Sequence, residues 1–198
     1  MLTPYIQRAA LKESLGIDDD EDDDALDRAI LSSSLGIDHK TGRTFGRDPA
    51  ASARTYRSSG RLLWTDDGWH EFLVDDVATD AGLVVEIGSA SGGYSAVSGF
   101  ITGPDNALVR GKPINSLLHP TGWPFYWAQL LRVTAVWGWP SIPADIEMAC
   151  QIQAGRLYRR KDSPEGVTAS TEWGPIRVAR LDPDVKDLID PYVLPGFG

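Results

Sequence analysis

The fold of this chain is decided by a stretch that begins Trp137-Gly138-Trp139-Pro140-Ser141-Ile142-Pro143-Ala144-Asp145-Ile146 and runs to Tyr192. Pro143 suits the first turn of a helix, and Asp145 and Glu147 suit the positive end of its dipole. Apolar residues then recur at helical spacing, namely Ile146, Ala149, Cys150, Ala154, Leu157 and Tyr158. Because burial of each stabilises the fold by roughly 1–3 kcal/mol, we expect a helix over residues 144–161 to be its main anchor.

Two further helices are predicted near the N-terminus. The first covers residues 2–15, with Thr3 as its cap and Gly16 as its left-handed stop. The second covers residues 25–35 and is expected to end in the same way, at Gly36.

An acidic run separates these two helices and consists of Asp18, Asp19, Asp20, Glu21, Asp22, Asp23 and Asp24. A calcium loop of the helix–loop–helix type needs a glycine at its sharp turn and a bidentate glutamate at its end. The run places neither correctly. We therefore expect an exposed, solvated linker whose last aspartate caps the next helix, rather than a metal site.

Residues 38–60 show no periodicity, and the pattern predicts a loop. Positive charge is spread over and just beyond it, at Arg43, Arg47, Arg54, Arg57 and Arg61. A solvated loop is favoured over a contact with an acidic neighbour.

From residue 61 to residue 137 the hydrophobic period changes to two, which is typical of strands. Arg61–Trp64 and Trp69–Val74 flank the turn sequence Asp66-Asp67-Gly68 and predict a hairpin. Further strands are predicted at Leu83–Ile87, Tyr94–Ile101, Ala107–Arg110 and Tyr126–Val136. The tryptophans of this segment are expected to pack the sheet rather than to bind a sugar or a base.

After the long helix, residues 163–173 are expected to be a mobile loop, and Ile176 and Val178 lie in a predicted short strand. Asp182 caps a short final helix that Pro191 ends. The remaining tail is apolar, and apolar tails often dock on a partner.

The predicted fold class is α+β. A small helical bundle, made of the two N-terminal helices and the long helix, is interrupted by an inserted antiparallel β subdomain. The predicted parts are residues 1–60, 61–137 and 138–198, of which the first and last form one helical domain.

Composition narrows the possible functions. The 198 residues carry a net charge of −9, which disfavours a general nucleic-acid binder. The single cysteine, Cys150, cannot form an internal disulfide, and it lies on the apolar helix face. Neither a long apolar run nor a secretory signal is present, so we expect synthesis in the cytoplasm.

The sequence holds no recognisable catalytic or metal-binding motif. His39, His70 and His119 have no metal-ligand spacing, and no nucleophile elbow or phosphate-binding glycine loop occurs. Asp75 and Asp76 are placed at a predicted strand end, where a solvated turn is favoured over a catalytic carboxylate pair. We expect no enzymatic activity, no cofactor and no metal.

Several motifs resemble, in order and spacing, those of head–tail connector (adaptor) proteins of long-tailed bacteriophages, which lie beneath the portal. They are Gly138-Trp139-Pro140, Ile142-Pro143-Ala144-Asp145-Ile146, the run from Arg156 to Pro164, Leu181-Asp182-Pro183-Asp184-Val185 and, after the N-terminal helices, Gly42-Arg43-Thr44-Phe45. The resemblance lies at both ends of the chain and leaves the middle unmatched.

This resemblance implies a structural virion protein that forms a ring, joins the portal to the tail and continues the DNA channel. The implied partners are the portal protein, other neck or tail-completion proteins, further copies in a dodecameric ring, and passing double-stranded DNA bound without sequence specificity. No membrane is implied. The implied location is the virion neck, with the host cytoplasm during assembly.

Two sets of site residues follow. The portal-docking candidates are Tyr192, Val193, Leu194, Pro195 and Phe197, and the alternative is that this tail folds back on its own subunit. The ring-interface or channel candidates are Arg156, Arg159, Arg160 and Lys161, whose charge is opposite to that of the N-terminal acidic run. A head-to-tail interface can place these two surfaces against each other in neighbouring subunits, and pairing within one chain is the alternative.

Two other functions remain open. A β-rich recognition module of the carbohydrate-binding type, on a phage tail, would expose aromatic residues on a sheet face and behave as a monomer. A small hydrolase would line a pocket with a histidine and a carboxylate.

Overall fold

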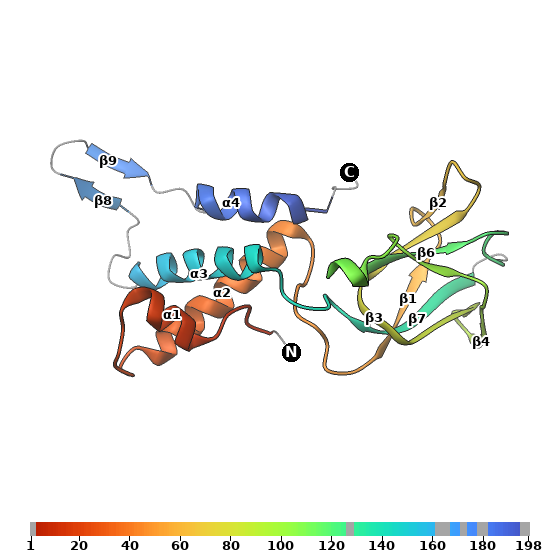
Figure 1. Cartoon of the computed structure of the whole chain (residues 1–198), viewed down its shortest axis with the longest axis horizontal. Helices are drawn as coiled ribbons and strands as arrows, with labels where there is room; N and C mark the ends of the chain where they lie inside the picture. The colour runs from red at the N-terminus through yellow and green to blue at the C-terminus, as the bar shows by residue number, and fades with distance from the viewer. Residues whose placement is uncertain (1–2, 126–128, 161–166, 171–173, 178–181, 195–198) are drawn as a thin grey trace. The chain divides into compact units, whose positions relative to one another are not determined.

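The computed structural model describes residues 3–125, 129–160 and 182–194, and the backbone of residues 167–170 and 174–177. The fold class is α+β, as predicted. The chain divides into two compact units, coloured along the sequence in Figure 1. Met1–Gly46 and Ile142–Gly198 form the helical unit, and Arg47–Ser141 form the β unit.

The helical unit is built on a long helix that packs against three others, as Figure 1 shows. Its helices are α1 (Arg8–Leu15), α2 (Asp23–Thr41), α3 (Ala144–Arg159) and α4 (Pro183–Ile189). Strands β8 (Val167–Ser170) and β9 (Gly174–Arg177) pair antiparallel between α3 and α4. A strand at residues 167–170 corrects the predicted loop, because a backbone ladder can form without a strong side-chain pattern.

The predicted long helix is confirmed in α3. Pro143 holds the N-cap position, and the predicted apolar face is buried at Ile146, Ala149, Cys150 and Ala154. The thiol of Cys150 lies 3.5 Å from the Ser34 hydroxyl of α2. This face of α3 is therefore the centre of the helical core.

The N-terminal helices differ from their predicted bounds. Helix α1 begins at Arg8 rather than near residue 2, so Gln7 and not Thr3 stands at its N-cap, while Gly16 ends it in the left-handed conformation as predicted. Upstream of α1, Tyr5 is buried against the core instead of lying on a helix. Tertiary packing thus replaces helical hydrogen bonding in the first residues.

Helix α2 passes through the predicted stop. Gly36 lies inside it, and the helix ends at Gly42, whose φ is 70°. A glycine inside a helix costs about 1 kcal/mol relative to alanine. Burial of the next residue, Ile37, is worth about 1.5–3 kcal/mol, so continuing the helix is favoured.

The acidic run is exposed only in part. Asp18, Asp19, Asp20 and Glu21 are exposed, as predicted for a linker, but the helix begins at Asp23 with Asp22 at its N-cap, so Asp24 is not the predicted cap. Asp20 and Asp23, however, each lie 2.6 Å from the Lys12 ammonium of α1, and these carboxylates raise the pKa of Lys12. Part of the run therefore ties α1 to the start of α2.

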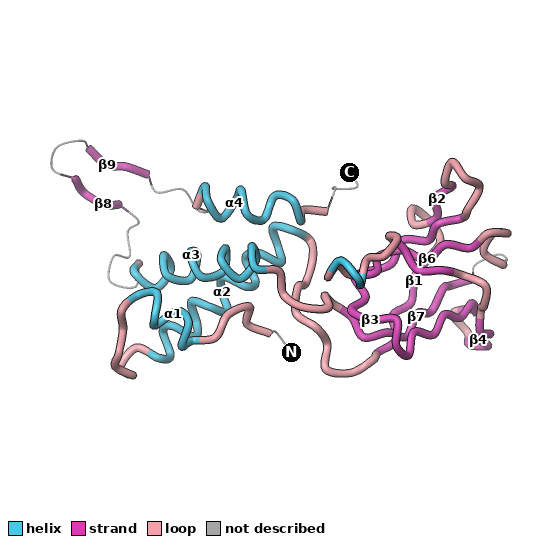
Figure 2. The backbone as a smooth tube through the Cα atoms, viewed as in Figure 1, coloured by secondary structure: helices cyan, strands magenta, loops and turns pink. Residues whose placement is uncertain are grey.

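The β unit contains one antiparallel sheet with the strand order β1-β7-β3-β6-β5, and β2 and β4 pair with β3 (Figure 2). Its strands are β1 (Ser52–Arg57), β2 (Leu62–Trp64), β3 (His70–Ser89), β4 (Gly92–Ala96), β5 (Ile101–Gly103), β6 (Ile114–His119) and β7 (Gln129–Trp137).

Strand β3 organises this sheet. Its first part pairs with β6 and its second part with β7, with register irregularities near Val77 and Thr79 where the partner changes. The resulting core includes Tyr56, Phe72, Val77, Val85, Ile114, Leu117, Leu131, Val133 and Trp137. The predicted face of residues 131–137 is therefore confirmed as buried.

Several strand predictions need correction. Residues 52–57, predicted as loop, form β1, because they find a partner in β7. Residues 108–110, predicted as strand, form the 3-10 helix η1. The strand predicted at 94–101 is shorter in the structure, because residues 97–100 lie outside β4. The strand at 114–119, β6, was not predicted from the sequence.

The carboxylates Asp75 and Asp76 lie within β3 rather than in a turn. Asp75 pairs with Arg54 at 2.9 Å, and Asp76 accepts a hydrogen bond from the Trp139 indole at 3.0 Å. These contacts allow carboxylates to stay inside a strand. The hairpin at Asp66-Asp67-Gly68 is confirmed between β2 and β3.

Candidate functional site

The predicted docking segment begins beside a cluster of three aromatic rings in the helical unit. Phe45, fully buried, makes edge-to-face contacts with Tyr5 and Tyr192, with ring centroids 5.8 and 5.5 Å apart. These rings come from the N-terminal segment, the segment after α2 and the end of the chain. The cluster therefore fixes three distant segments to one another.

The Tyr5 hydroxyl completes this cluster with hydrogen bonds. It accepts the Phe45 N–H at 2.9 Å and donates to the Asp38 carboxylate of α2. Burial raises the pKa of Tyr5 and of Asp38. The N–H of Tyr5 donates to Ser34 at 3.1 Å, so the start of the chain is held at two points along α2.

The C-terminal segment closes the open end of α2. The Leu194 N–H donates to the Thr41 carbonyl at 2.8 Å, which satisfies an acceptor that a helix end leaves unpaired. The Arg43 guanidinium donates through Nε to the Tyr192 carbonyl at 3.0 Å. The Leu194 side chain lies over Gly42, the residue that ends α2 in the left-handed conformation.

Tyr192 adds a contact with the start of α3. Its hydroxyl donates to the Asp145 carboxylate at 3.1 Å. Burial, and then this hydrogen bond, raise the pKa of Tyr192. The segment is thus attached to both α2 and α3 before it reaches residue 195.

Helix α4 determines where this segment starts. Asp182 caps α4 by accepting the Asp184 N–H at 3.0 Å, and its other oxygen accepts from Arg156 of α3 at 2.9 Å. Val185 and Ile189 form the buried face of α4. The predicted cap is confirmed, and it carries an ion pair to α3 that the sequence did not predict.

The portal-docking candidates now separate into two groups. Tyr192 is half-buried in its own unit, whereas the side chains of Val193 and Leu194 stay 38% and 42% exposed. Pro195 and Phe197 lie outside the described residues. Val193 and Leu194 therefore expose apolar surface directly after Tyr192, which is held against the helical unit.

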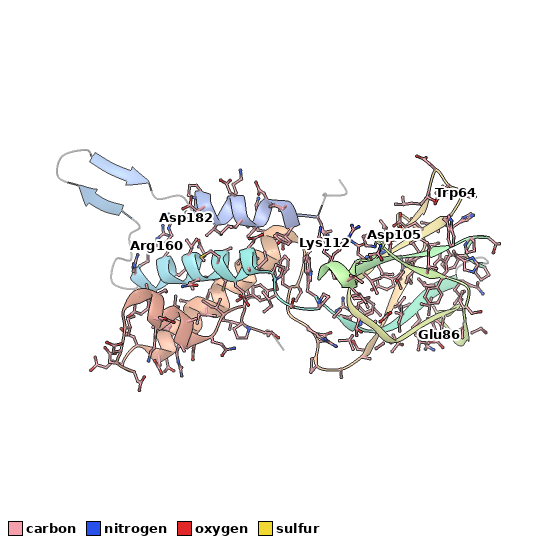
Figure 3. The ribbon with its side chains drawn as sticks, in the orientation of Figure 1. Trp64, Glu86, Asp105, Lys112, Arg160 and Asp182 are labelled. Atoms are coloured by element: carbon pink, nitrogen blue, oxygen red, sulfur yellow. The ribbon has the colours of Figure 1, made fainter. Side chains whose placement is uncertain are left out.

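The basic candidates also separate. Arg156 is held by Asp182, and Arg159 is exposed at the end of α3. Figure 3 labels Arg160 at this end and Asp182 at the start of α4. Lys161 lies outside the described residues.

Sequence reasoning missed Tyr5, Thr41, Arg43 and Phe45 as part of this site. Arg43 and Phe45 do belong to the motif Gly42-Arg43-Thr44-Phe45, but that motif assigned them no contact. Nothing local in the sequence indicated that the Phe45 ring meets Tyr5 and Tyr192.

Among the described residues, no helix combines the length and the apolar character that crossing a membrane requires. Nor, in the same residues, do three histidine, cysteine or acidic side chains converge as metal ligands would.

No family model and no curated protein matches this chain. Solved structures do resemble it in fold. A chain in the neck of an empty gene transfer agent (GTA) particle, computed with C6 symmetry, is 17% identical, with a TM-score of 0.61 over 98% of this chain and 92% of that chain. A chain in the virion of a native gene transfer agent particle is also 17% identical, with a TM-score of 0.56 over the same shares. The similarity spans both the helical unit and the β unit.

Proposed function

We propose that this chain is a structural protein of the neck of a tailed phage or phage-like particle. In this role it forms a ring as a head-to-tail connector, or adaptor. The observation that carries the proposal is a fold similarity that covers 98% of the chain, including the middle that resembled no family by sequence. The adaptor motifs at both ends of the sequence support the same role. Catalysis has no part in it.

The proposed partners follow from that role. One face of the ring joins the portal protein, the other meets neck or tail-completion proteins, and double-stranded DNA passes through without sequence-specific binding. The C6 symmetry with which one similar neck was computed is compatible with a dodecameric ring. The proposed location is the virion neck, after assembly in the host cytoplasm.

The C-terminal segment is proposed to dock on the portal. Tyr192 fixes its exit from the helical unit, Val193 and Leu194 are exposed, and the sequence continues with the apolar residues Pro195 and Phe197. Pro191 and Pro195 stiffen the chain and lower the entropy lost on docking. Well-packed apolar anchors commonly contribute about 2 kcal/mol or more, and a ring multiplies each contact through avidity.

Two truncations test this docking. A chain that ends at Leu194 keeps the contacts of Tyr192 and the hydrogen bond to Thr41, so we expect an unchanged melting temperature but loss of attachment to portal-bearing heads. A chain that ends at Asp190 loses those contacts as well, so its melting temperature should also fall.

Electron microscopy of heads mixed with each chain measures attachment, and thermal unfolding measures stability. Substitution of Glu13 by Ala is a suitable control, because this exposed side chain lies on α1, outside both sets of candidate residues. If the chain that ends at Leu194 joins heads and tails as well as the full chain does, the residues beyond Leu194 are not the dock.

One observation favours the second candidate function, recognition of a carbohydrate. Trp64 in the β unit is 74% exposed, although Trp123, Trp137 and Trp139 are buried as predicted. Binding of a neutral polysaccharide by a monomer, lost on substitution of Trp64 by Ala, would support recognition over the connector role.

A further inference from the structure

The β2–β3 hairpin presents an apolar and acidic tip, residues 63–67. Trp64 is 74% exposed and Leu63 45% exposed. The Trp64 ring rests on the His70 imidazole, with centroids 3.9 Å apart. Asp66 and Asp67 follow and are both exposed. The hairpin tip therefore combines a large apolar anchor with two negative charges.

The hairpin tip is held in shape by its own hydrogen bonds. The Thr65 N–H donates to the Trp69 carbonyl at 3.0 Å, and the Trp69 N–H donates to the Thr65 hydroxyl at 2.9 Å. Gly68 takes the positive φ that the turn requires. A fixed anchor loses little conformational entropy when a partner binds it.

A second exposed feature of the β unit, the basic turn at residues 109–112, has the opposite charge. Val109 is 87% exposed, and Arg110 and Lys112 beside it are also exposed. The turn is closed by a backbone hydrogen bond, in which the Lys112 N–H donates to the Ala107 carbonyl at 2.9 Å. Among the described residues, neither Arg110 nor Lys112 forms an ion pair. Asp105, an exposed acidic residue a few positions earlier in the chain, is not paired with either of them.

The two features lie at different ends of the β unit. Figure 3 labels Trp64 on the hairpin and Lys112 at the opposite end of the same unit. The hairpin tip of one molecule therefore cannot contact its own basic turn. Two unlike, complementary surfaces at opposite ends are the requirement for a head-to-tail contact that repeats from copy to copy.

We propose that the hairpin tip of one copy packs on the basic turn of the next copy in the ring. Trp64 covers Val109, while Asp66 and Asp67 face Arg110 and Lys112. The occupant of each surface is thus a second copy of this chain, and the inference rests on the proposed ring. Tryptophan is a frequent hot spot at protein interfaces, and the charges set the register of the contact.

Charge reversal gives a test in which two defective chains repair one another. An acid-reversed chain carries Asp66→Lys and Asp67→Lys, and a base-reversed chain carries Arg110→Glu and Lys112→Glu. In either chain alone, both surfaces have the same sign and should repel. In an equal mixture, every contact again joins opposite charges if the two chains alternate, and an even-numbered ring closes.

Rings of the full-length chain are counted by electron microscopy, free and on portal-bearing heads, at low and at high salt. We expect loss of rings for each reversed chain alone and recovery in the mixture. Trp64→Ala should weaken association about 30-fold, which corresponds to a hot spot of about 2 kcal/mol. Controls are Asp80→Lys and Arg57→Glu, exposed charges of the β unit outside both surfaces, which should leave ring formation unchanged.

Each other result counts against the pairing. If both reversed chains form rings alone, the inference is wrong and the proposed function is unaffected. If each fails alone and the mixture also fails, the two surfaces meet a different protein. If Trp64→Ala abolishes binding of a neutral polysaccharide but not ring formation, the hairpin tip is a recognition site instead. If the unmodified chain forms no ring, with or without portal, the proposed function fails as well.

Discussion

Asp38 is half-buried in the helical unit, where it accepts the hydrogen bond of the Tyr5 hydroxyl. Loss of solvent raises the pKa of this carboxyl, and the hydrogen bond from Tyr5, the charge of His39 and a hydrogen bond from Thr44 offset that shift in part. The aromatic cluster beside the docking segment is therefore linked to a group that resists ionisation.

A pH dependence of stability follows from this shift. A carboxyl whose pKa is higher in the folded state stabilises the fold fully below its ordinary pKa of 3.8. That contribution is lost as the pH rises through the higher folded value. In Asp38→Asn, the amide oxygen can still accept from Tyr5 but cannot ionise.

We therefore expect the difference in unfolding free energy between Asp38→Asn and the unmodified chain to move in favour of the variant as the pH rises from about 3 to 7. Urea unfolding at several pH values measures it. Taking the difference removes the opposite trend of exposed carboxyls such as Asp20, whose pKa is lowered by Lys12. A difference that stays constant over this range would contradict the assignment.

At the scale of the element, helix α2 shows how packing decides where a helix ends. Gly36 and Gly42 each follow residues of α2, yet the helix runs through the first and stops at the second. Ile37 and Thr41 are buried, and the Leu194 N–H caps the Thr41 carbonyl. The end of α2 is thus set by a residue from the other end of the chain.

Opposite effects are expected when these two glycines are changed to alanine. Gly36→Ala adds a methyl group that meets no atom within 4 Å, so the free energy of unfolding should rise by about 0.5–1 kcal/mol. Gly42 has φ 70°, so Gly42→Ala should lower it by about 1–2 kcal/mol.

Urea unfolding followed by circular dichroism at 222 nm measures both changes, and each variant is the control for the other. A destabilising Gly36→Ala would show that the helix does not continue through this position.

At the scale of the whole molecule, each unit has a core of its own. The helical core is centred on α3, and the β core lies against β3 and β7. The β unit is one continuous segment, so deleting it removes no helix of the helical unit.

We expect a chain in which Gly46 is joined to Ile142 by a short glycine–serine linker to keep its helical circular dichroism and to unfold cooperatively. Residues 47–141 alone should give a cooperative unfolding transition that is visible in tryptophan fluorescence, because Trp123, Trp137 and Trp139 are buried there. Complete loss of the helical signal in the joined chain would mean that the two parts do not fold independently.

The sequence by itself determined the features that depend on near neighbours. Periodicity identified α3 and its buried face, cap and stop residues identified α4 and Gly16, and Asp66-Asp67-Gly68 identified the hairpin. Each of these signals acts over a few residues, where hydrogen bonding and burial are set by the local pattern.

Only the tertiary structure decided the features that depend on distant partners. It made residues 52–57 a strand by supplying β7, and it continued α2 past Gly36 by burying Ile37. It also placed Tyr192 against Phe45 and Asp145, so that part of the predicted docking segment is held by its own unit. No local pattern could show these contacts, because their free energy exists only once segments far apart in the chain have come together.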